Sequence, residues 1–220
     1  LRQGRFDAGT FLRLKGGSAV SGAVCYRRAV KNNVLLNETA DFELLQPYVL
    51  VDTVGGNLQN ESYSFRGEWM RRAGNAVYSL GGSYRAVHEY RSFDPRPRNI
   101  SSDFKAGASL GLALPGGSLI GFASYRRYNQ DQNVTFVSNK GANTTLFHAT
   151  GLGQDYWRFR STGIFAATRY AGRGFSAGVV GSAARGSLTG GISYEWLSVT
   201  RYLSNQNDAP LTSLATGRLS

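Results

Sequence analysis

Several residue types are scarce in this chain, and each scarcity excludes a class of protein. The 220 residues contain one cysteine, Cys25, so the chain cannot form an internal disulfide. The two histidines, His88 and His148, are too few for a transition-metal site when no carboxylates cluster near them. We therefore expect no metal and no cofactor. No run of about 18 apolar residues occurs, which excludes transmembrane helices.

Acidic residues are also few, at 14 against 25 lysines and arginines, and the formal net charge is +11. Such an excess indicates either an anionic partner, such as lipopolysaccharide or an acidic solute, or arginines that line a polar interior and pair with carboxylates. The basic residues are dispersed and form no block of about five, which argues against nucleic acid as a partner.

Glycine and aromatic residues are abundant, with 28 glycines, 12 tyrosines and 12 phenylalanines. The clearest pattern covers residues 101–114, where apolar side chains from Phe104 to Leu114 alternate with polar, charged or glycine residues. Period-two alternation is typical of a strand with one apolar face. Pro115-Gly116-Gly117-Ser118 follows and predicts a reverse turn.

The same alternation predicts antiparallel strands along the whole chain, joined by short turns at one end and long loops at the other. The expected tight turns lie at residues 15–18, 72–75, 115–118 and 171–174. The expected long outer loops lie near residues 30–60, 91–100 and 130–159. This sorting by length is typical of membrane barrels, and strands of about ten residues match the roughly 9–11 that cross a bilayer.

These features predict an all-β fold: an antiparallel, up-and-down transmembrane β-barrel in the cell outer membrane. Residues 1–220 would form a single segment of eight or nine strands within a larger barrel. Its expected role is transport, or binding at the cell surface through the long loops. The expected partners are the lipid bilayer and lipopolysaccharide. The alternative is a soluble β-sandwich that binds acidic glycans, but its strands would average about five or six residues. Tyrosine and tryptophan near the strand ends also favour bilayer interfaces.

If the apolar faces contact lipid, the opposite faces point into a lumen and carry a stripe of charge. The stripe comprises Arg13, Arg27, Arg66, Arg85, Lys105, Arg169, Asp7, Glu68, Glu89 and Asp103. Either Arg126 or Arg127 would join it. Charges buried in a dry core cost several kcal/mol each unless paired, whereas a wet lumen removes that cost. The stripe therefore indicates a channel or binding cavity for anions, or a charge network inside a structural barrel, and both readings stay open.

Three further candidates carry less weight. Arg96 and Arg98, each of which directly follows a proline, predict either a basic clamp in an outer loop or simply a stiff loop. His88 or His148 would be the general base if the chain were a barrel hydrolase, but no motif supports catalysis and we expect no enzyme. Apolar residues 44–51 would be a docking surface if the chain were a non-transporting subunit that binds other outer-membrane proteins.

Several motifs together resemble an uncharacterised family, a domain of unknown function, of Gram-negative outer-membrane β-barrel proteins. They are Asp41-Phe-Glu-Leu-Leu-Gln-Pro-Tyr-Val49, Asp52-Thr-Val-Gly-Gly56, His88-Glu-Tyr-Arg91, Asp94-Pro-Arg-Pro-Arg98, Gly151-Leu-Gly-Gln-Asp-Tyr156 and Arg158-Phe-Arg160. The resemblance implies a porin-like barrel considerably longer than this chain, and it implies no activity and no catalytic residues. The chain also opens without a signal peptide and ends without a terminal aromatic residue, so we expect a fragment.

Overall fold

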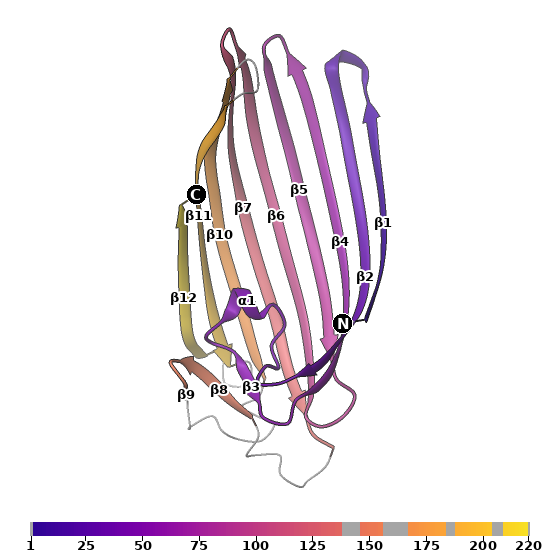
Figure 1. Ribbon diagram of the computed structural model, residues 1–220, viewed down its shortest axis with the longest axis vertical. Coiled ribbons are helices and arrows are strands. Elements are labelled where there is room, and N and C mark those ends of the chain that lie inside the picture. Colours follow the sequence, from indigo (N-terminus) through magenta and orange to yellow (C-terminus); the bar gives the residue numbers. More distant parts are fainter. Residues whose placement is uncertain (1, 138–145, 156–166, 184–187, 204–208, 220) are drawn as a thin grey trace.

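Nine long strands form one antiparallel sheet in the computed structural model (Figure 1). The structure describes residues 2–137, 146–155, 167–183, 188–203 and 209–219. The sheet contains β1 (Arg2–Arg13), β2 (Ser18–Val34), β4 (Gly56–Ala73), β5 (Ala76–Tyr90), β6 (Arg96–Leu114), β7 (Gly117–Thr135), β10 (Thr168–Ala183), β11 (Thr189–Leu203) and β12 (Ala209–Leu219). A short 3-10 helix, η1 (Lys15–Gly17), joins β1 to β2.

Each strand of the large sheet pairs with the next one in chain order, from β1 to β12. The short turns gather at the top of Figure 1 and the long connections at the bottom. This confirms the predicted antiparallel, up-and-down fold with short connections at one end. The sheet is open, since β1 and β12 each pair with one neighbour within the described residues. It therefore has the form of a barrel segment.

The turn predicted at residues 171–174 is wrong. β10 runs without interruption through this stretch and pairs with both β7 and β11. Its glycines allow the neighbouring strands to approach closely, because a Cβ at Gly174 would overlap the carbonyl oxygen of Trp196. Glycine marks tight turns and close backbone approach alike, which explains the error. Parts of the loop predicted over 130–159 lie outside the described residues.

The register gives the sheet two faces of opposite character. On the apolar face, Phe65, Tyr84 and Phe104 lie side by side on β4, β5 and β6, each more than two-fifths exposed. On the polar face, the strand residues that alternate with them include Arg85 and Asp103, which pair directly across β5 and β6. Every strand of the sheet has between 11 and 19 residues, which reaches the roughly 9–11 needed to cross a bilayer. Neither helix in the described residues is long and apolar enough for that crossing.

Residues 35–55, which we call the strap, fold back over the polar face instead of extending away from the sheet (Figure 1). The strap contains α1 (Phe42–Leu45) and β3 (Leu50–Asp52). β3 forms a small second sheet with β8 (Leu146–Gly151) and β9 (Gln154–Asp155). Much of the apolar core lies between strap and sheet.

That core packs strap residues against the polar face near β7, β10 and β11. Its buried members are Leu45, Val49, Val51, Tyr128, Tyr170, Leu197 and Val199. The suggestion that residues 44–51 form an external docking surface is therefore wrong. Four of those residues, Leu45, Val49, Leu50 and Val51, are buried against the protein's own wall.

Two glycines provide a test of how closely the strands pack. At Gly107 on β6, an added Cβ would lie 2.7 Å from the carbonyl oxygen of Ala123, whereas at Gly121 on β7 it would meet nothing within 4 Å. We expect Gly107→Ala to destabilise the sheet by about 1–3 kcal/mol through overpacking. Gly121→Ala should be neutral or slightly stabilising.

The measurement is the midpoint of urea unfolding of the full-length protein in lipid vesicles, followed by tryptophan fluorescence. Equal midpoints for the two variants would show that the strands have room to separate at Gly107.

Candidate functional site

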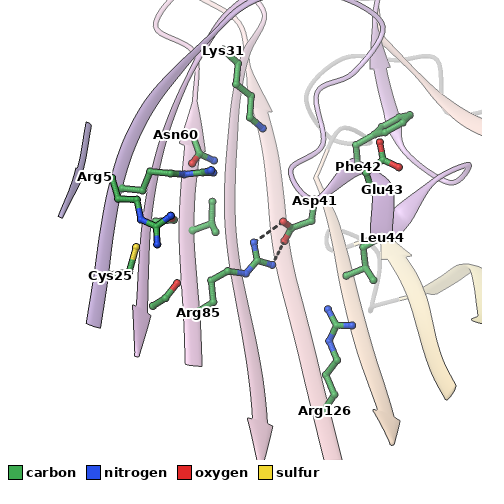
Figure 2. A pocket seen from close by; sticks show the side chains of 14 residues that line it. Arg5, Cys25, Lys31, Asp41, Phe42, Glu43, Leu44, Asn60, Arg85 and Arg126 are labelled. Atoms are coloured by element: carbon green, nitrogen blue, oxygen red, sulfur yellow. Dashed lines mark hydrogen bonds and ion pairs between the residues drawn. The ribbon is translucent and has the colours of Figure 1, made fainter. Parts of the chain in front are cut away.

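A hollow of about 720 Å³ lies between the strap and the polar face of the first strands (Figure 2). Positive side chains dominate its lining. The five cationic side chains are Arg5, Arg27, Lys31, Arg85 and Arg126, and the two carboxylates are Asp41 and Glu43, both from the strap. Because like charges repel and attract counter-ions, this lining favours anions.

The strap contacts the wall through Asp41, at the N-terminus of α1. Asp41 has a positive φ of 53°, a left-handed conformation in which its carboxylate points to the sheet (Figure 2). Both nitrogens of the Arg85 fork donate to the two carboxylate oxygens at 2.8 Å. The hydroxyls of Ser101 and Tyr128 lie 3.2 and 3.1 Å from Oδ2 of Asp41. Bidentate pairs of this kind are among the stronger hydrogen bonds in proteins.

The environment of Asp41 shifts its titration. Burial raises the pKa of the carboxyl, but the hydrogen bonds and the charge of Arg85, helped by Tyr128 and Ser101, outweigh that effect. The net result is a pKa below the ordinary aspartate value, so the carboxyl of Asp41 is fully ionised near neutral pH.

Further ion pairs continue across the polar face. The carboxylate of Asp103 accepts two hydrogen bonds from Arg126, at 2.9 and 2.8 Å, and lies 3.8 Å from Arg85. Glu89, which is fully buried, contacts Lys31 at 2.5 Å and accepts a hydrogen bond from an asparagine side chain at 2.8 Å. Most of the cations around the hollow therefore already have an acidic partner.

Arg27 differs from the other cations of the hollow. Its Nε is buried and has no hydrogen-bond partner among the described residues. The neighbouring Arg5 is held by Asp7 at 2.6 Å, which leaves Arg27 the cation most available to a bound anion. A buried N–H without a partner is costly, so an anion or water would gain by contacting it.

A second ionic group fixes the two ends of the strap. Arg91 is completely buried between Glu38, near the start of the strap, and Asp52, near its end. Its Nη1 lies 3.0 Å from Asp52, and it also contacts Glu38 and the carbonyl oxygen of Gly55. The ring of Phe93 lies 5.7 Å from the guanidinium. We call Arg91, Glu38 and Asp52 the Arg91 cluster.

Nine of the ten predicted stripe residues lie on the polar face. Arg27 and Arg85 line the hollow, and Arg85 also lines a neighbouring one of about 450 Å³ that contains Asp7, Arg66, Asp103 and Lys105. Glu89 is buried beside Lys31. Arg13, which is exposed, and Glu68, which is half-buried, lie nearer the short turns and line neither hollow.

The placement of Arg169 on this stripe is wrong. Its neighbours along β10, Thr168 and Tyr170, are buried on the polar face, so Arg169 points to the opposite side. There it lies 3.9 Å from Asp131 of β7. The turn predicted at 171–174 divided β10 in two, so the alternation of its side chains between the two faces could not be followed along the whole strand.

The other sequence candidates do not combine into a site. Arg96 donates to Asp94 at 2.9 Å, and Asp94 also accepts from the backbone of Val137 at 2.9 Å, as a stiffened loop requires. Arg98 is an exposed residue of β6. His88 stacks on Tyr90, with ring centroids 4.9 Å apart, whereas His148 is fully buried in β8. No group of three metal-ligating side chains occurs within the described ranges.

Sequence reasoning placed Arg85 but missed the strap residues and Arg91. Asp41 and the Arg91 cluster lie in or beside loops, where no periodicity indicates a direction. Lys31 extends the polar row of β2 and could have been found by alternation, whereas Arg126, left open against Arg127, lies on the same face as Ser124 and Tyr128.

Comparison with known proteins identifies a family and a fold. The model of a family described as "Family of unknown function (DUF6850)" matches residues 1–220. No curated protein matches the sequence.

Two solved structures share the architecture. The outer membrane transporter YddB from Escherichia coli is 9% identical, with a TM-score of 0.53 over 99% of this chain and 32% of the transporter. BauA, the ferric preacinetobactin receptor from Acinetobacter baumannii, is 8% identical, with a TM-score of 0.52 over 99% of this chain and 36% of the receptor. This chain thus spans about a third of each, and the likeness shows the fold of an outer-membrane β-barrel.

The Arg91 cluster yields a test of what holds the strap. Arg91→Met would leave Glu38 and Asp52 buried without a counter-charge, and breaking a buried pair costs about 3–5 kcal/mol. We expect the strap to open and chymotrypsin to cleave it at Phe42 or Tyr48 at a much higher rate. Arg28→Met is the matched control, since Arg28 pairs with Glu61 at 3.5 Å and is 60% exposed. Such exposed pairs contribute about 0–1 kcal/mol.

If the two variants were cleaved at the same rate, the buried cluster would not be what closes the strap.

The lowered pKa of Asp41 predicts an acid-sensitive strap. A carboxyl with a depressed folded pKa contributes stability above its unfolded pKa, about 3.9, and loses it as pH falls through the lower folded value. Hydrogen-exchange protection of the α1 amides, corrected for intrinsic rates, should therefore decline below about pH 4. Asp41→Asn removes this titration, so its lower protection should vary less over the same range. A wild-type profile as flat as the variant's would refute the assignment.

Proposed function

This chain belongs to DUF6850, a family of unknown function, and we propose that it forms part of the wall of an outer-membrane β-barrel that binds and passes anionic solutes. In this proposal the apolar face contacts the lipid bilayer and lipopolysaccharide of a Gram-negative cell. The polar face lines a porin-like interior. The cell outer membrane is the proposed location, and the proposal contains no catalytic step.

One observation carries the proposal: the sheet presents large apolar side chains to the outside on one face and a cation-lined hollow on the other. Phe65, Tyr84 and Phe104 are exposed without any covering element in the described residues. In water such a contiguous apolar surface would be unusual, whereas in a bilayer it is required. The architecture shared with two outer-membrane barrels supports the same orientation.

The open edges of the sheet support a longer barrel. In lipid, every backbone N–H and C=O must be paired, so no spanning sheet leaves an edge exposed. β1 and β12 each have one described neighbour, and the chain spans about a third of the structures that it resembles. Further strands of a longer protein, or another outer-membrane protein, would therefore complete the barrel in this proposal.

A closed structural barrel is the second candidate, and the ion pairs around Arg85, Arg126 and Glu89 favour it. In that case the charges would only neutralise one another. Arg27 separates the two candidates, because it faces the hollow and has no ion pair with any described acid. A pathway for anions needs such a cation, whereas a neutral network does not.

The proposed function predicts anion selectivity. The full-length protein, extracted from outer membranes with detergent, should form pores in planar bilayers that favour chloride over potassium. Arg27→Glu should lower the permeability ratio several-fold, since it reverses a charge in a low-dielectric passage. Arg169→Glu makes the same change on the opposite face and should leave the ratio nearly unaltered.

Recovery of the protein in the soluble fraction without detergent would contradict the membrane assignment. Absence of conductance, or unchanged selectivity in Arg27→Glu, would favour the structural barrel.

A further inference from the structure

We propose that Arg85, Ser101 and Tyr128 form a carboxylate-binding site in the barrel wall, which Asp41 of the strap fills in the manner of an internal ligand. A solute carboxylate would compete with Asp41 for this site. The inference rests on the proposed function, because that function places the polar face where solutes pass.

The site is built entirely from the wall. Arg85, Ser101 and Tyr128 come from the adjacent strands β5, β6 and β7, and their polar atoms converge on one carboxylate. Arg85 supplies two parallel donors at 2.8 Å, the geometry in which a guanidinium recognises a planar carboxylate. Ser101 is 2% exposed, and Tyr128 is fully buried with its hydroxyl also 2.7 Å from Oε1 of Gln130, so both hydroxyls are held in place beside the carboxylate.

The occupant belongs to a separate element. Asp41 lies on the strap, 44 residues before Arg85, and belongs to no strand of the large sheet. Its backbone has a left-handed conformation, φ 53°, which is strained for a residue with a side chain. The ion pair offsets this strain, so a ligand that takes Arg85 would also remove the reason for that conformation.

The space beside the site fits a solute with more than one acidic group. The hollow of about 720 Å³ is within the usual range of small-molecule pockets, roughly 300–1,000 Å³. Arg126 lines it and lies close to the same carboxylate network, while Arg27 and Lys31 line its other side. A small di- or tricarboxylate would place one carboxylate on Arg85 and another toward Arg27.

Internal competition has a measurable consequence. When the strap occupies a site for most of the time, the apparent affinity for a solute equals the intrinsic affinity multiplied by the fraction of time that the site is free. Removing the internal carboxylate should raise that affinity without any new contact to the solute. A solute carboxylate that binds the site would then displace Asp41, and with it the strap, from the wall.

The experiment measures citrate binding by isothermal titration calorimetry with the full-length protein in detergent. We expect Asp41→Asn to bind citrate about tenfold more tightly than the wild type. Glu61→Gln is the matched control, since it removes one negative charge from the opposite face of β4, where Glu61 pairs with Arg28 at 3.5 Å and lines neither hollow. It should change the affinity less than about twofold.

Addition of Arg85→Lys to Asp41→Asn keeps the positive charge but loses the fork, so the gain should disappear. The inference is overturned if Asp41→Asn binds citrate no more tightly than the wild type, or if Glu61→Gln produces the same gain. Either result could accompany an intact effect of Arg27→Glu on selectivity, in which case the proposed function would stand. Tighter citrate binding without any pore would support the site and remove the transport role.

Discussion

The alternation of side chains along long strand pairs, whose register shifts only near the ends of β2 and β11, decides which face of the sheet each residue occupies. Successive side chains of a strand point to opposite faces, and paired strands share that division, so a residue's face is decided for the sheet as a whole. Cations such as Arg27 and Arg85 therefore gather on one face, and rings such as Phe65 and Tyr84 on the other. A slip of one residue would bring the rings into the hollow.

The strap supplies what the polar face lacks. Its Asp41 neutralises Arg85 at the centre of the wall, while Glu38 and Asp52 enclose Arg91 at the strap's two ends. Buried ion pairs add little net stability compared with apolar packing, but losing one partner is costly, so they select one arrangement. The apolar cluster beneath the strap stabilises it, and the charged contacts determine where it lies.

Much of the candidate site could be predicted from alternation, and the misses have physical causes. Residues such as Arg66 and Lys105 were assigned to the correct face because their strands are long and regular. Arg169 was not, because glycines at 172 and 174 resemble a turn although they allow neighbouring strands to approach closely. Asp41 could not be found, because a loop residue has no period that would indicate its direction.

Local periodicity and turn chemistry are enough to predict most strands, the two faces of the sheet and the sorting of short and long connections. The pairing of each acid with its cation, in contrast, depends on how the chain folds back on itself. Asp41 and Arg85 are 44 residues apart, and Asp52 and Arg91 are 39 apart. These pairs form because the strap follows one particular path over the wall. Packing and charge across the whole sheet select that path, and no local sequence pattern indicates it.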